Sequence, residues 1–155
     1  GMLKALGEKI TKDLGGLVVR FWNVYGYETD DNKSHVITDF IKMAKKDNVI
    51  KMRTDGTESR QFLYAEDACE ALLTLSKKYH ELDKTQDYCI TSFKWSKVYE
   101  IAKILDVLSS CEVIPSNRQD ETQRNAMNEP DPYIKKYWKP KTSLEQGVMK
   151  LYNKY

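Results

Sequence analysis

Arg60 and Asn23 are the two side chains of this sequence whose type and position best suit a phosphorylated ligand. The planar guanidinium of Arg60 can hold two phosphate oxygens, although an arginine beside a strand is commonly solvated or paired with a carboxylate such as Glu58. Asn23 directly follows the apolar run from Leu17 to Trp22, and open α/β sheets bind ligands at the carboxyl ends of their strands. Asparagine also stabilises turns, and on the residues alone a turn is its favoured role.

Three other parts of the chain carry polar residues that could either bind a ligand or serve the fold. The stretch 115–132 is polar and irregular, and its Arg118 could reach a phosphate or be solvated in a loop. His35 stands at the start of an expected helix, where a lone histidine is more often solvated or locally hydrogen-bonded than catalytic. Asp67, with Glu70 three residues on, resembles a capping box and is expected to be structural.

The elements that must position these residues alternate between helix and strand. Apolar stripes at helical spacing, capping residues and β-branched runs predict them. We expect helices over 3–14, from a Ser34 cap to about 44, over 67–79, from a Ser96 cap to 108, over 133–138, and after a capping box of Thr142 and Glu145. We expect strands over 17–22, 49–53, 61–64 and 88–91.

Three of these strands carry a further expectation about their partners. Strand 17–22 is almost continuously apolar, which is typical of a parallel sheet covered on both faces. Strands 49–53 and 61–64 are expected to be the two arms of a strand–turn–strand unit with its turn at Asp55-Gly56.

Composition restricts the class of protein. A chain of 155 residues suits one domain with a sizeable core. The formal net charge of +2 lacks the basic excess of nucleic-acid-binding proteins. No apolar run approaches the roughly 18 residues that span a bilayer, so we expect a cytoplasmic protein with neither nucleic acid nor membrane as partner. Cys69, Cys89 and Cys111 show no CxxC or Cys/His pairing, so we expect reduced thiols and no metal site.

Four motifs resemble those of one enzyme family in both order and spacing. Together they cover nearly the whole chain outside the 115–132 stretch. They are Lys4-x-x-Gly7-Glu8, Arg20-x-x-Asn23-Val-Tyr-Gly26, Asp55-Gly-x-x-x-Arg60-x-Phe-x-Tyr-x-x-Asp67 and Pro140-Lys-Thr-Ser-Leu-Glu-x-Gly147. The series is similar to the C-terminal half of the NAD-dependent epimerase/dehydratase family, which comprises extended short-chain dehydrogenases that act on nucleotide sugars.

The resemblance implies the fold and its division. The chain would be α/β and a single fragment, with residues 2–26 and 87–108 forming the last helix and strands of a partial Rossmann-like NAD-binding sheet. Residues 27–86 and 109–155 would form the small α/β substrate-binding domain. Apolar residues on the first helix, such as Leu3, Leu6 and Ile10, would then lack their usual cover. We therefore expect a homo-oligomer, or a missing NAD-binding half as partner.

The resemblance also implies a nucleotide-diphosphate sugar as ligand. The family's asparagine and arginine at the positions of Asn23 and Arg60 contact the diphosphate, and an arginine near Arg118 often adds a phosphate contact. The segment that starts the second helix usually lies against the nucleotide. The expected substrate-binding residues are Asn23, Lys33, His35, Val36, Arg60 and Arg118.

Lys4 falls at the lysine of the family's Tyr-x-x-x-Lys pair, which holds the nicotinamide ribose of NAD or NADP and lowers the tyrosine pKa. The tyrosine would fall one position before Gly1, and no G-x-G-x-x-G occurs in the 155 residues. We therefore expect this chain alone to bind no NAD and to be inactive, as the substrate-binding half of an epimerase or dehydratase. The alternative is a non-catalytic binding or oligomerisation module derived from the family. Epimerisation, dehydration and reduction stay open, as do the base and the sugar.

Overall fold

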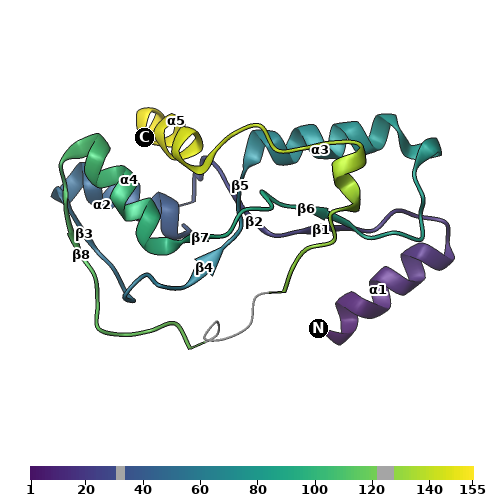
Figure 1. Ribbon diagram of the computed structural model, residues 1–155, viewed down its shortest axis with the longest axis horizontal. Helices are drawn as coiled ribbons and strands as arrows, with labels where there is room; N and C mark the ends of the chain where they lie inside the picture. The colour runs from purple at the N-terminus through teal and green to yellow at the C-terminus, as the bar shows by residue number, and fades with distance from the viewer. Residues whose placement is uncertain (31–33, 122–127) are drawn as a thin grey trace.

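Helices and short strands alternate along the chain, as the sequence predicts. A computed structural model describes residues 1–30, 34–121 and 128–155 (Figure 1). The helices are α1 (Met2–Asp13), α2 (Val36–Asp47), α3 (Ala65–Lys77), α4 (Val98–Ser109) and α5 (Leu144–Lys154), with 3-10 turns η2 (Tyr79–Glu81) and η3 (Tyr133–Lys136). The strands are β1 (Val19–Phe21), β2 (Asn23–Tyr25), β3 (Val49–Lys51), β4 (Ser59–Arg60), β5 (Phe62–Tyr64), β6 (Tyr88–Ile90), β7 (Ser96–Lys97) and β8 (Glu112–Ile114).

Three of the strand pairs are parallel, as expected of an α/β chain. They join β1 to β6, β2 to β5 and β3 to β8, while β4 and β7 pair antiparallel. The expected strand–turn–strand unit is wrong, because β3 pairs with β8 and β5 pairs with β2. The turn itself forms at Gly56, whose φ of 76° suits glycine. It packs against Tyr99 of α4, and the chain beyond it pairs with β7 instead of returning along β3.

Two apolar clusters share strand β5 between them. The first lies among α2, α4 and α5, toward the left of Figure 1, and contains Ile41, Ile101 and Leu151. The second lies among α3, β6 and η3, toward the right, and contains Leu75, Ile90 and Ile134. Along β5, Phe62 and Tyr64 enter the first cluster and Leu63 enters the second. This alternation fixes β5 in the middle of the molecule, buried on both faces.

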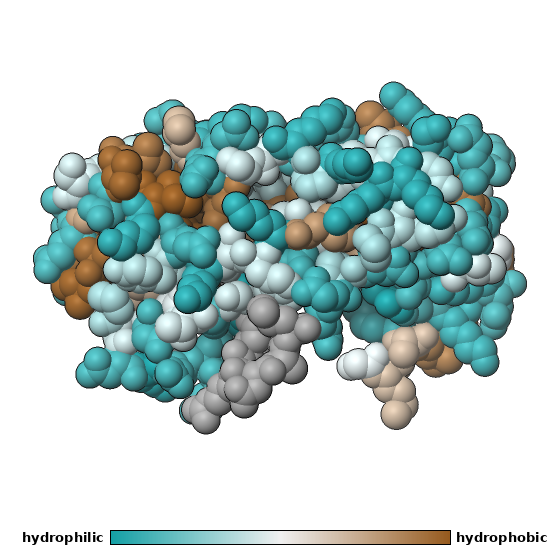
Figure 2. Space-filling view, in the orientation of Figure 1, coloured by the Kyte–Doolittle hydropathy of each residue, from teal (hydrophilic) through white to brown (hydrophobic). Residues whose placement is uncertain are grey.

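Helix α1 contributes no buried residue. Its apolar side chains Leu3, Leu6 and Ile10 are 85%, 52% and 49% exposed, and Figure 2 shows apolar surface at the N-terminal end of this helix, at lower right. Strand β1 is likewise open, since Arg20 and Phe21 are exposed. The expectation of a strand covered on both faces is therefore wrong for the described residues.

Ion pairs tie α1 to the rest of the chain. Arg20 Nε and Nη2 donate to the two carboxylate oxygens of Glu8 at 2.8 and 2.6 Å, and Lys12 Nζ lies 2.8 Å from Asp87 Oδ1. Glu8 thus meets Arg20 rather than Lys4, its neighbour on the helix, because the guanidinium fork matches both carboxylate oxygens.

Three expected helix caps are displaced by one residue or more. The N-cap of α2 is His35, and the Ser34 hydroxyl donates to Asp39 instead. Ser96 lies in β7, and the N-cap of α4 is Lys97. The final capping box also forms one position later than expected, between Ser143 and Gln146 rather than Thr142 and Glu145. The physical reason in the last case is that Asp67 engages the Thr142 hydroxyl.

Asp67 is structural, as expected, but it does not cap its own helix. Helix α3 has Tyr64 at its N-cap, and Asp67 lies buried in the first turn. Its Oδ2 accepts hydrogen bonds from the backbone amides of Lys141 and Thr142 at 3.0 and 2.8 Å, and its Oδ1 accepts one from the Thr142 hydroxyl at 3.1 Å. One carboxylate therefore anchors the segment that enters α5.

The cysteines are free thiols, with Cys89 and Cys111 buried and Cys69 exposed. Within the described ranges, no helix is long and apolar enough to cross a membrane.

Candidate functional site

Asn23 lies where the chain changes sheet partner. Trp22 N–H still donates to Ile90 O of β6 at 3.3 Å, whereas Asn23 pairs with Phe62 of β5. The turn favoured for Asn23 is therefore wrong, because Asn23 opens strand β2. Its side chain is exposed just past the carboxyl end of β1, the edge at which parallel sheets bind ligands.

A hollow of about 250 Å³ opens beside Asn23, and we call it the Asn23 hollow. It brings together Asn23 from β2 and His35 and Val36 from the start of α2, three residues that the sequence predicted to share a ligand. Lys33, predicted for the same site, lies outside the described residues. The full lining is Trp22, Asn23, Val24, Tyr25, Glu28, His35, Val36, Ile37, Thr38 and Phe62.

A second and wider hollow, the Lys4 hollow, lies on the α1 side of Asn23 and measures about 680 Å³. Lys4 lines it together with Glu8 and Arg20, and Trp22 and Asn23 border both hollows. The hydrogen bond from Arg20 lowers the pKa of Glu8 and raises that of Arg20, so both groups are charged at neutral pH. Among the described residues that line this hollow, Lys4 is the cation without a carboxylate partner within 4.0 Å.

Glu28 organises the wall of the Asn23 hollow, although no motif in the sequence pointed to this residue. Its Oε2 accepts from the His35 backbone amide at 3.0 Å, and its Oε1 contacts His35 Nδ1. Burial raises the pKa of Glu28, but hydrogen bonds from the Thr38 side chain and from His35 outweigh this and hold that pKa below its ordinary value. Tyr155 fixes the backbone of Glu28, since its hydroxyl accepts from Glu28 N at 2.8 Å and donates to Glu28 O at 3.0 Å. No sequence signal links residues 28 and 155.

Arg60 is half-buried on β4 and has a carboxylate partner different from the one expected. Its Nη1 donates to Ser59 O at 2.9 Å, and its Nη2 lies 3.2 Å from Asp120 Oδ2. Glu58, the expected partner, instead accepts a hydrogen bond from Thr54 at 2.7 Å. Because the Arg60–Asp120 pair is only partly shielded from solvent, an incoming anion can compete with Asp120 for the guanidinium.

Arg118 lies on the same loop as the partner of Arg60. Its carbonyl oxygen accepts from Asp55 N at 2.7 Å, which holds this loop against the 54–56 turn, and its side chain is exposed. Neither Arg60 nor Arg118 is among the described residues that line the two hollows. Phe62, which lines the Asn23 hollow, follows Arg60 by two residues in the chain.

The predicted residues therefore fall into two groups. One contains Lys4, Asn23, His35 and Val36 around two hollows, and the other contains Arg60 and Arg118. Over residues 1–30, 34–121 and 128–155, no three His, Cys, Asp or Glu side chains are grouped to hold a metal ion. The chemistry available is hydrogen bonding and charge pairing with an extended polar, anionic ligand.

Comparisons with known proteins show the family of this chain. The model of the NAD dependent epimerase/dehydratase family matches residues 2–91. GDP-L-fucose synthase of Sinorhizobium fredii is 31% identical over 143 residues, which cover 86% of this chain and 44% of that protein. The chain therefore spans less than half the length of this relative.

Solved structures share the fold. UDP-glucose 4-epimerase of Thermotoga maritima, solved with UDP-glucose, has a TM-score of 0.75 at 20% identity, with 96% of this chain and 49% of that chain covered. The dTDP-glucose 4,6-dehydratase of Bacillus anthracis, solved in complex with NAD, has a TM-score of 0.75 at 21% identity, with 97% and 48% covered. These likenesses confirm the expected Rossmann-like α/β fold, of which the chain holds about half.

Proposed function

Because this chain belongs to the NAD-dependent epimerase/dehydratase family, we propose that it supplies the nucleotide-sugar-binding half of an enzyme that modifies the sugar of a nucleotide-diphosphate sugar. The observation that carries the proposal is the shared border formed by Trp22 and Asn23. A ligand that crosses this border contacts the His35 side in one hollow and the Lys4 side in the other. A sugar joined to a nucleotide through a diphosphate has the extended shape and the polar groups for both.

Each predicted residue takes a role that its position supports. Asn23, an uncharged donor at the border, and Arg60 hold the diphosphate, with Arg60 exchanging Asp120 for phosphate oxygens. Arg118 adds a second positive charge from the neighbouring loop. His35 and Val36 contact the nucleotide from the start of α2, and Lys33 is proposed to act with them.

The cofactor of the family fits the Lys4 hollow in part. When bound, NAD or NADP supplies hydride transfer. The Lys4 ammonium is a hydrogen-bond donor suited to the ribose hydroxyls of the nicotinamide nucleotide, and it lines a hollow large enough for a ribose. The glycine-rich turn that binds the cofactor pyrophosphate does not occur in these 155 residues. We therefore assign α1, β1 and β6 to the cofactor side, and propose that this chain alone neither binds NAD nor carries out the redox step.

The open side of α1 and β1 supports a partner for this chain. Arg20 and Phe21 of β1 are exposed, whereas the strands of parallel sheets are normally covered on both faces. We propose that a cofactor-binding half or a second copy covers Leu3, Leu6 and Ile10. A strictly monomeric profile in analytical ultracentrifugation at micromolar concentration would argue against self-association.

Calorimetric titration with GDP-, UDP- and dTDP-sugars tests the binding proposal. We expect one nucleotide sugar to bind and NAD to give no signal. Arg60→Ala should weaken binding at least about tenfold, because a charge-assisted hydrogen bond contributes roughly 1.5–3 kcal/mol. Lys77→Ala, which removes an exposed charge from the far end of α3, is the matched control and should bind like the wild type. Equal affinity of the Arg60→Ala variant would refute the assigned role.

A further inference from the structure

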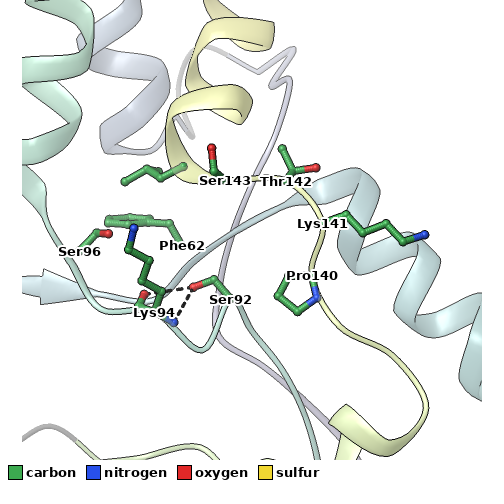
Figure 3. Close-up of a pocket in the computed structure, with 9 residues that line it drawn as sticks. Phe62, Ser92, Lys94, Ser96, Pro140, Lys141, Thr142 and Ser143 are labelled. Atoms are coloured by element: carbon green, nitrogen blue, oxygen red, sulfur yellow. Dashed lines mark hydrogen bonds between the residues drawn. The ribbon is translucent and has the colours of Figure 1, made fainter.

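A third hollow lies apart from the proposed nucleotide-sugar site, between the loop that follows β6 and the N-terminal end of α5. It measures about 260 Å³, and we call it the Lys94 hollow. No aspartate or glutamate lines it within the described residues. Its lining is Phe62, Ser92, Lys94, Ser96, Pro140, Lys141, Thr142, Ser143 and Leu144 (Figure 3).

The two lysines of this hollow point in different directions. Figure 3 shows the Lys94 side chain extending toward Ser96 and the ring of Phe62, and the Lys141 ammonium turned away. Lys141 Nζ is paired with Glu70. In the part of the chain that the structure describes, Lys94 Nζ has no carboxylate partner within 4.0 Å. Lys94 therefore brings an unbalanced positive charge to the hollow.

Ser96 brings a hydroxyl whose hydrogen-bonding capacity is unused. The residue is only 4% exposed, it lines the hollow, and its hydroxyl makes no hydrogen bond to the described residues. The neighbouring hydroxyls are engaged: Ser92 donates to Lys94 O at 3.1 Å, Thr142 donates to Asp67, and Ser143 accepts from Gln146 N at 3.2 Å. A ligand or water molecule in the hollow can therefore hydrogen-bond to the Ser96 hydroxyl.

The N-terminal end of α5 contributes a positive electrostatic potential to the hollow, which favours a bound anion. This helix has 11 residues, and Leu144, its first residue, lines the hollow. The capping box engages the amides of Ser143 and Gln146, which leaves those of the first two helical residues for a ligand or solvent. Helix N-termini attract anions through such amides and through the helix dipole.

We propose that the Lys94 hollow is a second ligand site, which binds a tetrahedral oxyanion such as the phosphate of a small phosphate monoester. Lys94 Nζ neutralises the charge, Ser96 Oγ donates a hydrogen bond, and the start of α5 lies alongside. The site is distinct from the Asn23 hollow and shares only Phe62 with it. Its occupant therefore contacts the ring that also lines the proposed nucleotide pocket.

The test is an NMR titration of the full chain with inorganic phosphate, carried out in an Arg60→Ala background. This background removes the phosphate contact that the proposed function assigns to Arg60. We expect saturable shifts of the Lys94, Ser96 and Leu144 amides. Lys94→Ala should weaken phosphate binding by about tenfold or more, and Ser96→Ala by several-fold. Lys141→Ala is the matched control, because Lys141 lines the same hollow but its ammonium points away, and the phosphate affinity of this variant should stay within about twofold of the wild type.

Two further ligands identify the chemistry. Acetate tests for a carboxylate site, and chloride at equal ionic strength tests for a nonspecific salt effect; both should shift these amides less than phosphate does. Unchanged phosphate affinity of the Lys94→Ala variant, or equal shifts with chloride, overturns the proposal. Because nucleotide sugars are absent, failure here leaves the proposed function untouched, and failure of nucleotide-sugar binding leaves this result untouched.

Discussion

Replacing Asp67 by alanine should be among the most destabilising single changes in this chain. The carboxylate is 4% exposed and accepts three hydrogen bonds from the segment that enters α5, two from backbone amides and one from the Thr142 hydroxyl. Removal of the carboxylate leaves these three donors, which lie about 75 residues further along the chain, without a protein partner.

The magnitude follows from what each group loses. Hydrogen bonds to a charged acceptor contribute roughly 1.5–3 kcal/mol each, and their sum would overstate the effect because shared partners are not additive. Lys141 is exposed, so water can reach its amide once the carboxylate is gone. We therefore expect Asp67→Ala to lower the free energy of unfolding by about 3 kcal/mol. Asp67→Asn keeps an acceptor oxygen for the amides and should cost about 1 kcal/mol.

Urea-induced unfolding, followed by far-UV circular dichroism, measures these differences. Glu66→Ala is the matched control, since Glu66 precedes Asp67 but is exposed and pairs with Lys150 only at 3.4 Å. It should change the free energy of unfolding by about 0.5 kcal/mol or less. If Asp67→Ala and Glu66→Ala destabilise equally, Asp67 does not hold the α5 entry segment and this reasoning fails.

Three further predictions concern α5 and the Asn23 hollow. Gly147→Ala would place a Cβ 2.0 Å from the hydroxyl oxygen of the buried Tyr25, so the free energy of unfolding should fall by about 2 kcal/mol in the same urea assay. Gly7→Ala is the control, because a Cβ at Gly7 meets no atom within 4 Å, and this variant should be as stable as the wild type or more stable. Tyr155→Phe removes both hydrogen bonds to Glu28 and should speed hydrogen exchange of the Glu28 amide by about tenfold, measured by NMR; an unchanged rate would contradict the positioning role. The folded-state pKa of Glu28 lies below its ordinary value of 4.5, so the ionised carboxylate contributes its full stabilisation above pH 4.5 and loses it as pH falls through the folded-state pKa. In acid unfolding followed by circular dichroism, Glu28→Gln should abolish this part of the pH dependence of stability.

Local sequence patterns determined where most elements lie. The apolar stripe over residues 3–14 predicted α1, and Gly15, just past this helix, has the positive φ of 74° that suits glycine. The motif series predicted the family and the α/β class, because each motif occupies a short stretch of chain and can be recognised without knowledge of the tertiary structure. Asn23, His35 and Val36 were likewise predicted to lie together, and they line one hollow.

Only the tertiary structure decided which strands pair and which charges meet. The arms expected to flank the Gly56 turn separated, because β5 must bury Phe62 and Leu63 in opposite clusters and therefore lies beside β2. Arg60 met Asp120 rather than the nearby Glu58.

Tertiary structure also decided which residues hold the walls of the hollows in place. Tyr155 holds Glu28, and Asp67 holds Thr142, across more than 70 positions in the chain. Periodicity and capping act within a few residues and can be read from the sequence. Long-range hydrogen bonds and ion pairs depend on where packed elements bring distant side chains, and a single sequence carries no local signal for that.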